Sequence, residues 1–364
     1  MAENCCEMKK EIGSIFPLSD EVLQKAESEK TCFSRDRLFY SLCREALYDI
    51  AVSLDESNKK VLIPAYTCQT VITPFEEAGW QCDFFSIHKD LRVDIQSLCN
   101  AVEYIQPSLI VVHPYFGVDL NKEEVQTLKI IHEKGIMIVL DLTQCLFSTK
   151  QYDFATFIVA SYRKWMPIPD GGFLINLSDM VKISQPEVEN CEFCEKEKDA
   201  MYLRGHYFLN GKQRMKDLSI RLSKSADRYA ENHIYPHKMS QVSYNLLLSE
   251  DTVQNQHKRF ANYSYLFKTV IENKKISKVC NDIKEVTTAP LYFAIFVQDR
   301  QKLQRQLAKD SIYAPIIWPV EDEKTLINDE VKYIYNHLLA IPCDQRYDEK
   351  DMQRATEIIN NFCL

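Results

Sequence analysis

A lysine and an aspartate follow two successive strands that the sequence predicts. Lys164 comes shortly after the apolar run 154–160, and Asp141 directly follows the apolar run 136–140. Because parallel strands end at the same edge of a sheet, we expect both side chains to reach one crevice there. Each residue alone has a plainer interpretation. An aspartate after a strand often caps the next helix, and a lysine beside Trp165 can stack or snorkel at the surface.

Together, Lys164 and Asp141 suit the chemistry of pyridoxal phosphate (PLP). This cofactor needs a lysine amine for a Schiff base and a carboxylate that keeps its pyridine nitrogen protonated, which makes the ring an electron sink. Ser161, three residues before the lysine, is placed to donate a hydrogen bond to the cofactor phosphate. Gly171 and Gly172 permit a tight return into the next strand. The sequence therefore predicts a PLP site centred on Lys164.

Strands and helices alternate through the first half of the chain. The predicted strands are near-continuous apolar runs, which are typical of a parallel sheet with helices on both faces, and this predicts a three-layer α/β/α fold. The predicted strands are 60–64, 81–87, 109–112, 136–140, 154–160 and 173–175, and the helices are 35–54, 68–79 and 122–134.

The pattern changes after residue 180. It is helical and charged to about residue 270, and then mixes predicted strands (291–297, 313–318) with predicted helices (300–308, 349–362). This change predicts a smaller α+β domain after the sheet. We expect an N-terminal segment over 1–29, a large PLP-binding α/β domain over 30–250, and a small C-terminal α+β domain over 251–364.

Composition narrows the class of protein. The 364 residues carry a net charge of −8, which argues against a nucleic-acid-binding surface as the main function. Glu3, Glu7 and Glu11 near the start argue against a secretory leader, and no run approaches the roughly 20 apolar residues of a membrane span. The thirteen cysteines are scattered through apolar segments, which favours reduced thiols and a soluble cytoplasmic protein.

Cys191 and Cys194 have the spacing of a metal-binding pair. No second pair and no nearby histidine accompany them, so a solvated acidic loop is favoured over a zinc site and we expect no metal.

Three segments in this order resemble the DegT-like sugar aminotransferase family, which has the aspartate aminotransferase fold (fold type I). The resemblance covers roughly residues 30–360, and its most specific part surrounds the lysine. The segments are Ile63-Pro64-Ala65-Tyr66-Thr67-Cys68, Asp141-Leu142-Thr143-Gln144 and Ser161-Tyr162-Arg163-Lys164-Trp165-Met166-Pro167-Ile168-Pro169-Asp170-Gly171-Gly172.

The resemblance implies a role for each matching residue. Lys164 would be the Schiff-base lysine, Asp141 would pair with the pyridine nitrogen, Gln144 would lie beside the ring, and Ser161 would reach the phosphate. The family's usual reaction transfers an amino group, commonly from glutamate, to a nucleotide-linked keto-sugar. Its active sites are shared across a homodimer, so the implied partners are an amino donor, a keto acceptor and a second copy of the chain, without nucleic acid or membrane.

Two departures from the family pattern concern the cofactor. The family opens its first helix with a Gly-Thr or Gly-Arg step that binds phosphate, whereas the segment 33–38 here has no glycine. Arg35 or Arg37 would supply a charged contact beside helix amides, and an ordinary charged helix start is the alternative. Cys68 stands where many members place an aromatic ring against the cofactor, and nearby Tyr66 would compensate.

Further residues have two interpretations each. Lys238 aligns with the segment that reaches the partner subunit's phosphate in this family. His113, Tyr115 and Phe116 end a strand on the cofactor side, where they either shape the substrate pocket or pack structurally. Arg346 would either grip a substrate carboxylate in bidentate fashion or pair with Asp344.

The sequence supports three functions in order. The first is a PLP-dependent aminotransferase. The second is a lyase or dehydratase of the same fold, although a histidine replaces the lysine in the family's dehydratases and Lys164 is present here. The third is a non-catalytic PLP-fold binding protein, which the missing glycine keeps open.

Overall fold

The computed structural model describes residues 10–29, 31–54 and 57–362. Its larger sheet has seven strands in the order β1-β7-β6-β5-β4-β2-β3. Strands β6, β5, β4, β2 and β3 run parallel, and β7 is antiparallel to both of its neighbours, β6 and β1. The strands are β1 (Leu38–Tyr40), β2 (Lys60–Pro64), β3 (Gln81–Phe85), β4 (Leu109–Val112), β5 (Met137–Asp141), β6 (Phe157–Ser161) and β7 (Gly172–Asn176).

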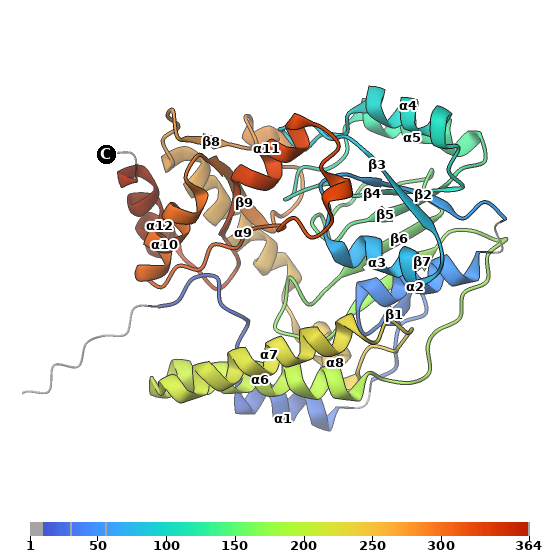
Figure 1. The fold of residues 1–364 in the computed structure, drawn as a ribbon. Coiled ribbons are helices and arrows are strands. Elements are labelled where there is room, and N and C mark those ends of the chain that lie inside the picture. The colour runs from blue at the N-terminus through green and yellow to red at the C-terminus, as the bar shows by residue number, and fades with distance from the viewer. Residues whose placement is uncertain (1–9, 30, 55–56, 363–364) are drawn as a thin grey trace, which may run out of the picture.

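Helices cover both faces of this sheet. Helices α2 (Cys43–Ser53) and α3 (Gln69–Glu77) lie on one face, and α4 (Ile95–Ile105) and α5 (Lys122–Glu133) lie on the other (Figure 1). Alternate strand residues enter different cores, because successive side chains of a strand point to opposite faces. Val61 and Ile63 pack with α2 and α3, whereas Leu62 between them packs in the core of the opposite face. Apolar residues on both sides explain the unbroken apolar runs in the sequence.

The elements after residue 251 form a second, smaller sheet with its own helices, which we call the C-terminal unit. Its sheet has the order β10-β9-β8 and is antiparallel throughout. It has a core of its own, in which Phe293, Ile295 and Leu339 are buried. The unit contains α9 (Thr252–Thr269), β8 (Ile276–Lys278), η1 (Ile283–Glu285), β9 (Tyr292–Val297), α10 (Arg300–Lys309), η2 (Glu323–Thr325), α11 (Asp329–His337), β10 (Leu338–Pro342) and α12 (Glu349–Asn361).

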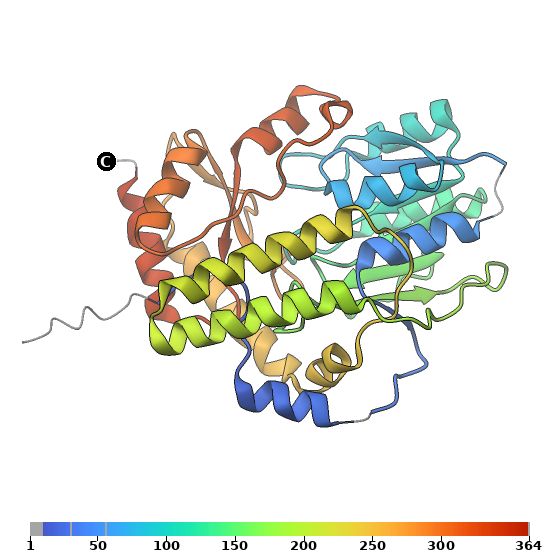
Figure 2. The ribbon, with the colours of Figure 1, turned by 60° about the horizontal axis from the view of Figure 1, so that its bottom comes forward.

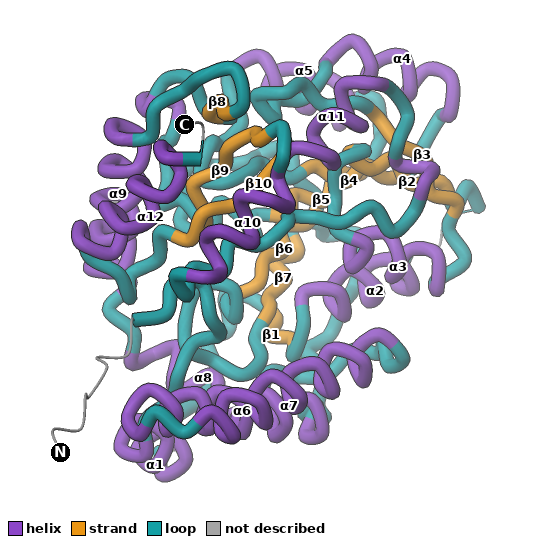
Figure 3. Tube along the Cα trace, turned by 60° about the vertical axis from the view of Figure 1, so that its left-hand side comes forward, coloured by secondary structure: helices purple, strands orange, loops and turns teal. Residues whose placement is uncertain are grey.

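A long helical hairpin runs beneath both parts. Helices α6 (Cys191–Asn210) and α7 (Gln213–Glu231) lie side by side (Figure 2), joined at Gly211, whose left-handed backbone ends α6. Helices α1 (Asp20–Ser28) and α8 (Gln241–Ser249) lie on the same side of the molecule (Figure 3).

The segment before α1 ties the hairpin to the C-terminal unit. Glu11 is buried and forms ion pairs with Arg204 of α6 (3.1 Å) and with Lys216 of α7. The backbone amide of Gly13 donates to the hydroxyl of Tyr347 at 2.7 Å. These contacts fix the segment at Glu11 and Gly13, beside the site described below.

Most of the predicted elements are present, and the fold class is confirmed. The predicted helix over 35–54 is wrong at its start, because Leu38–Tyr40 pairs with β7 and the helix begins only at Cys43. The predicted strand over 313–318 is also wrong, since this segment is a loop. Cys191 and Cys194 lie in the first turn of α6 rather than in a loop.

Two expected absences can be compared with the described part of the chain. Within it, no cluster of three or more His, Cys, Asp or Glu side chains is arranged to hold a metal. No helix among those residues is long and apolar enough to cross a membrane.

Gly172 lets α2 approach the sheet closely. A Cβ atom at this position would lie 2.7 Å from the backbone nitrogen of Cys43 and 2.9 Å from its Cα. Backbone atoms cannot move aside as a flexible side chain can, so we expect Gly172→Ala to lower the free energy of unfolding by about 1–3 kcal/mol. Urea unfolding followed by circular dichroism measures this change.

Gly135→Ala is the matched control. Its Cβ would meet nothing within 4 Å, and only the positive φ of +89° opposes the substitution, so the expected loss is about 1 kcal/mol. A wild-type unfolding midpoint for Gly172→Ala would contradict the close approach.

Candidate active site

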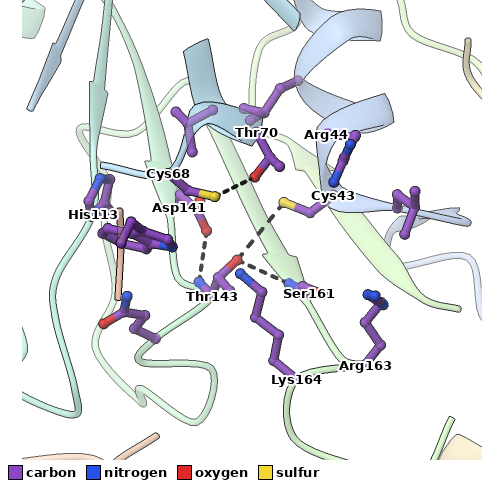
Figure 4. Close-up of a pocket in the computed structure, with 15 residues that line it drawn as sticks. Cys43, Arg44, Cys68, Thr70, His113, Asp141, Thr143, Ser161, Arg163 and Lys164 are labelled. Carbon is purple, nitrogen blue, oxygen red and sulfur yellow. Dashed lines mark hydrogen bonds between the residues drawn. The ribbon is translucent and has the colours of Figure 1, made fainter. Parts of the chain in front are cut away.

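A cavity opens where strands β4, β5 and β6 of the large sheet end and α2 begins (Figure 4). Asp141 and Ser161 end β5 and β6, and His113 directly follows β4. The residues that line the cavity are Leu42, Cys43, Arg44, Leu47, Cys68, Thr70, Val71, His113, Asp141, Thr143, Gln144, Ser161, Arg163, Lys164 and Trp318. Lys164 and Asp141 thus face the same space, as the sequence predicts.

Thr143 organises the carboxylate at the base of the cavity. Its backbone amide donates to Oδ1 of Asp141 at 2.8 Å, and its hydroxyl accepts from the amide of Ser161 at 3.2 Å. Burial raises the pKa of Asp141, while the Thr143 hydrogen bonds and the charge of Lys164 oppose this rise. An ionised carboxylate has about four acceptor positions, so Asp141 retains capacity for a cationic N–H donor in the cavity.

Trp165 anchors the loop that carries Lys164. The tryptophan is 1% exposed, its indole nitrogen donates to the carbonyl of Thr143 at 2.7 Å, and the guanidinium of Arg259 lies 4.5 Å from its ring. Lys164 itself is exposed. The fixed indole anchors the backbone next to Lys164, and the lysine lines the cavity.

His113 is a neutral side chain in this setting. Its ring is 6% exposed, and a hydrogen bond of 3.0 Å joins Nε2 to the hydroxyl of Thr67. Burial, together with the charge of Lys164, lowers the pKa of His113 to about 3. The imidazole is therefore uncharged at neutral pH.

The first turn of α2 forms the other end of the cavity. Leu42 occupies the N-cap position and makes no side-chain capping hydrogen bond, so no cap side chain competes with a ligand for the first-turn amides. A helix N-terminus favours an anion. Arg44 and Arg163 line the cavity nearby, and burial together with the charge of Arg163 lowers the pKa of Arg44. Two neighbouring guanidinium groups at a helix N-terminus suit a phosphate.

The other predicted cofactor residues are distributed differently. Gln144 is 4% exposed and accepts from the amide of Phe116 at 3.1 Å, with its amide group in the cavity wall. Cys68 is the N-cap of α3 and also lines the cavity. Arg35 is exposed and lies eight residues before α2 begins, outside the cavity.

Tyr66 and Lys238 also lie outside this cavity. Tyr66 is fully buried, and its carbonyl accepts from the hydroxyl of Tyr115 at 2.5 Å. The Lys238 amine lies 4.3 Å from the ring of Phe33, and its backbone pairs with Tyr40. The contact predicted for Lys238 involves a second subunit and stays a prediction.

A second cavity lies against Lys164 and Arg163 and extends toward the C-terminal unit. It is lined by Gly13, Ser14, Ile15, Phe16, Arg163, Lys164, Met166, Ile168, Pro169, Glu197, Met201, Ser223, Arg259, Leu291, Tyr292, Pro315, Pro342, Asp344 and Arg346. Arg259 and Arg346 in its wall both make hydrogen bonds to other protein groups. The Nε atom of Arg259 donates to the side-chain oxygen of Gln345 at 2.8 Å. Arg346 pairs through Nε and Nη2 with both Asp344 oxygens at 2.8 Å, which is one of the two alternatives that the sequence left open.

Sequence reasoning gave no role to several lining residues, among them Cys43, Arg44, Thr143 and Trp318. Cys43 and Arg44 were missed because the sequence does not show where α2 begins. Its N-cap, Leu42, is apolar and gives no capping pattern. Thr143 stood inside the quoted aspartate motif without an assigned role. Trp318 comes from a distant loop of the C-terminal unit, and nothing local in the sequence places it here.

Known proteins share the fold of this chain but have little sequence similarity to it. Neither a family model nor a curated protein matches the sequence. Among solved structures, the aminotransferase PseC of Helicobacter pylori, involved in pseudoaminic acid biosynthesis, is similar with a TM-score of 0.69 and 14% identity, over 97% of this chain and 99% of PseC.

Two further solved structures have the same fold. The sugar aminotransferase CalS13 of Micromonospora echinospora has a TM-score of 0.67 and 12% identity, over 97% of this chain and all of CalS13 (100%). Spr1654 of Streptococcus pneumoniae, solved in its PLP form, has a TM-score of 0.66 and 13% identity, over 97% of this chain and 98% of Spr1654. The chain therefore has the fold of these aminotransferases along almost its whole length.

The neutral His113 makes stability depend on pH. The unfolded chain binds a proton at this histidine near its ordinary pKa of about 6.5, whereas the folded protein does so only near 3. Between these values the unfolded state holds more protons, so stability falls as the pH falls. We expect the wild type to lose about 2 kcal/mol more stability than His113→Gln between pH 8 and pH 5.

Chemical denaturation at a series of pH values measures this difference. The difference in free energy of unfolding between the two proteins at pH 8 measures the packing that the variant loses. This difference serves as the baseline. Parallel stability curves for the two proteins down to pH 5 would show that His113 is not held neutral.

Proposed function

We propose that this protein is a PLP-dependent aminotransferase. The observation that carries the proposal is one cavity that holds Lys164, the buried Asp141 and the uncapped start of α2 with Arg44. An amine, a buried carboxylate and an anion site are the three groups that PLP requires. The similarity in fold to an aminotransferase and to a protein solved in its PLP form supports the same assignment.

The side chains of the cavity fit PLP. Lys164 would hold the cofactor covalently through Nζ, Asp141 would accept a hydrogen bond from the protonated pyridine nitrogen, and Arg44, with Ser161 and the first turn of α2, would hold the phosphate. When bound, PLP supplies an electron sink that stabilises negative charge on the substrate carbon.

The chain's own groups would then handle the protons. The Nζ atom of Lys164 would act as the base that removes the proton from the substrate carbon and returns it. Asp141 would stay ionised, because a protonated pyridine nitrogen beside it would offset the cost of burying the carboxylate. Thr143 keeps the carboxylate oriented through its hydrogen bond to Oδ1.

The substrate would enter through the second cavity, which adjoins Lys164. By the family resemblance, the amino donor is commonly glutamate and the acceptor a keto substrate such as a nucleotide-linked keto-sugar. A homodimer would complete each site, with Lys238 reaching the phosphate of the partner subunit. All ten cysteines that the structure describes are free, which supports a reducing compartment and a cytoplasmic enzyme.

Reductive trapping tests the proposal. Purified protein should be yellow with PLP, and borohydride followed by peptide mapping should place the reduced cofactor on Lys164. Lys164→Ala should abolish the trapped product, because Lys164 is the one lysine among the described residues that line this cavity. Lys182→Ala, which removes an exposed lysine outside both cavities, should trap PLP like the wild type.

The outcomes separate the three functions suggested by the sequence. Protein that stays colourless after incubation with PLP would exclude both PLP enzymes. If PLP binds, amino donors should convert it to the pyridoxamine form, and loss of water from a substrate without any donor would instead indicate a lyase.

The phosphate contact can be tested separately. Arg44→Gln should weaken PLP binding at least tenfold, because a hydrogen bond to a charged group contributes about 1.5–3 kcal/mol. Arg35→Gln should leave the affinity within about twofold of wild type, since this side chain lies outside the cavity. Titration of apoprotein with PLP by absorbance measures both, and the reverse order of effects would return the phosphate contact to Arg35.

A further inference from the structure

Trp318 enters the cavity from the C-terminal unit. It lies in the loop between α10 and η2, more than 150 residues after Lys164 in the chain. Two backbone hydrogen bonds hold the loop shortly before Trp318. The amide of Tyr313 donates to the carbonyl of Ile12 at 2.7 Å, and the carbonyl of Pro315 accepts from the amide of Ala340 at 3.1 Å. The loop is therefore tied to β10 and to the N-terminal segment.

Aromatic side chains surround the indole of Trp318 on the protein side. Ring centroids of Tyr66, His113 and Tyr115 lie 5.2, 5.9 and 6.4 Å from it, at interplanar angles of 52°, 81° and 59°. Tyr66 and Tyr115 are almost fully buried. These contacts leave the indole little freedom to rotate, and its remaining surface faces the cavity.

The indole is the larger of the two aromatic rings in the cavity wall, the other being the imidazole of His113. Around it, the wall offers short side chains such as Cys68, Thr70 and Val71 and the charged groups of Asp141, Lys164 and Arg44. A thiol and a methyl group give a flat ligand few contacts. An indole contributes a wide apolar surface and a π-system that pairs favourably with another ring.

We propose that Trp318 is a cofactor-positioning residue, whose indole packs on the ring of PLP and couples the C-terminal unit to cofactor binding. This inference rests on the proposed PLP site. It assigns the aromatic contact to a loop of the C-terminal unit rather than to the strand ends of the large sheet. Loss of the cofactor would then loosen the loop, because the indole would lose a partner on its cavity side.

Two substitutions at one position test the proposal. Trp318→Phe keeps an aromatic face, and Trp318→Leu keeps apolar volume without a π-system. PLP titration of the apoproteins should give an affinity within about threefold of wild type for the phenylalanine variant. We expect a loss of about tenfold for the leucine variant, the upper range for an aromatic pair.

Tryptophan fluorescence adds a readout that does not depend on activity. The chain has three tryptophans, Trp80, Trp165 and Trp318. PLP should quench the wild-type emission, and the quenched fraction should fall in Trp318→Phe. Trp80→Phe is the matched control, because Trp80 lies against Phe75 outside the cavity and donates to the carbonyl of Ala51. Its removal should leave the affinity unchanged.

The possible results are distinct. Folded Trp318→Leu that binds PLP as tightly as wild type, with quenching unchanged in Trp318→Phe, would overturn the role of Trp318 and leave the PLP site intact. Wild-type protein that binds no PLP would overturn the proposed function, and this inference with it. If Trp318→Leu does not fold, an unchanged quenched fraction in Trp318→Phe still overturns the proposal.

Discussion

The buried carboxylate of Asp141 is the constraint around which the site is arranged. Water no longer solvates this side chain, and burial raises its pKa. A charge in such a place requires hydrogen bonds and a nearby cation. Thr143 supplies the hydrogen bond, and Lys164 supplies a positive charge at the mouth of the cavity. The same Thr143 residue accepts from the amide of Ser161 and from the indole of Trp165, so the carboxylate and the lysine loop share one support.

The opposite end of the cavity depends on how closely α2 packs on the sheet. Gly172 in β7 lies under the first turn of the helix and leaves room for its backbone. The helix begins without a side-chain cap, so no cap side chain competes with an anion at the helix start beside Arg44. The polarity of the cavity follows from these two ends. A carboxylate that suits a cationic ring nitrogen faces a helix N-terminus that suits a phosphate.

The C-terminal unit, which has a hydrophobic core of its own, completes the wall of the cavity. Its loop carries Trp318 into the cavity, and the segment around Gly13 joins it to the hairpin of α6 and α7. The arginines that it presents to the second cavity are occupied by protein groups, as in the pair of Arg346 with Asp344. Their role in that wall is therefore structural in the described chain.

The sequence alone predicted six of the seven strands of the large sheet, its coverage by helices and the placement of Lys164 and Asp141 in one cavity. Apolar runs and strand ends are local features, and the carboxyl ends of parallel strands must meet at one edge. Tertiary structure decided the rest. Leu38–Tyr40 became a strand because β7 offered it a partner, which moved the helix start from Arg35 to Cys43 and brought Arg44 into the cavity. Trp318 reached the same cavity through contacts between segments far apart in the chain, and the spacing of residues along a sequence carries no record of such contacts.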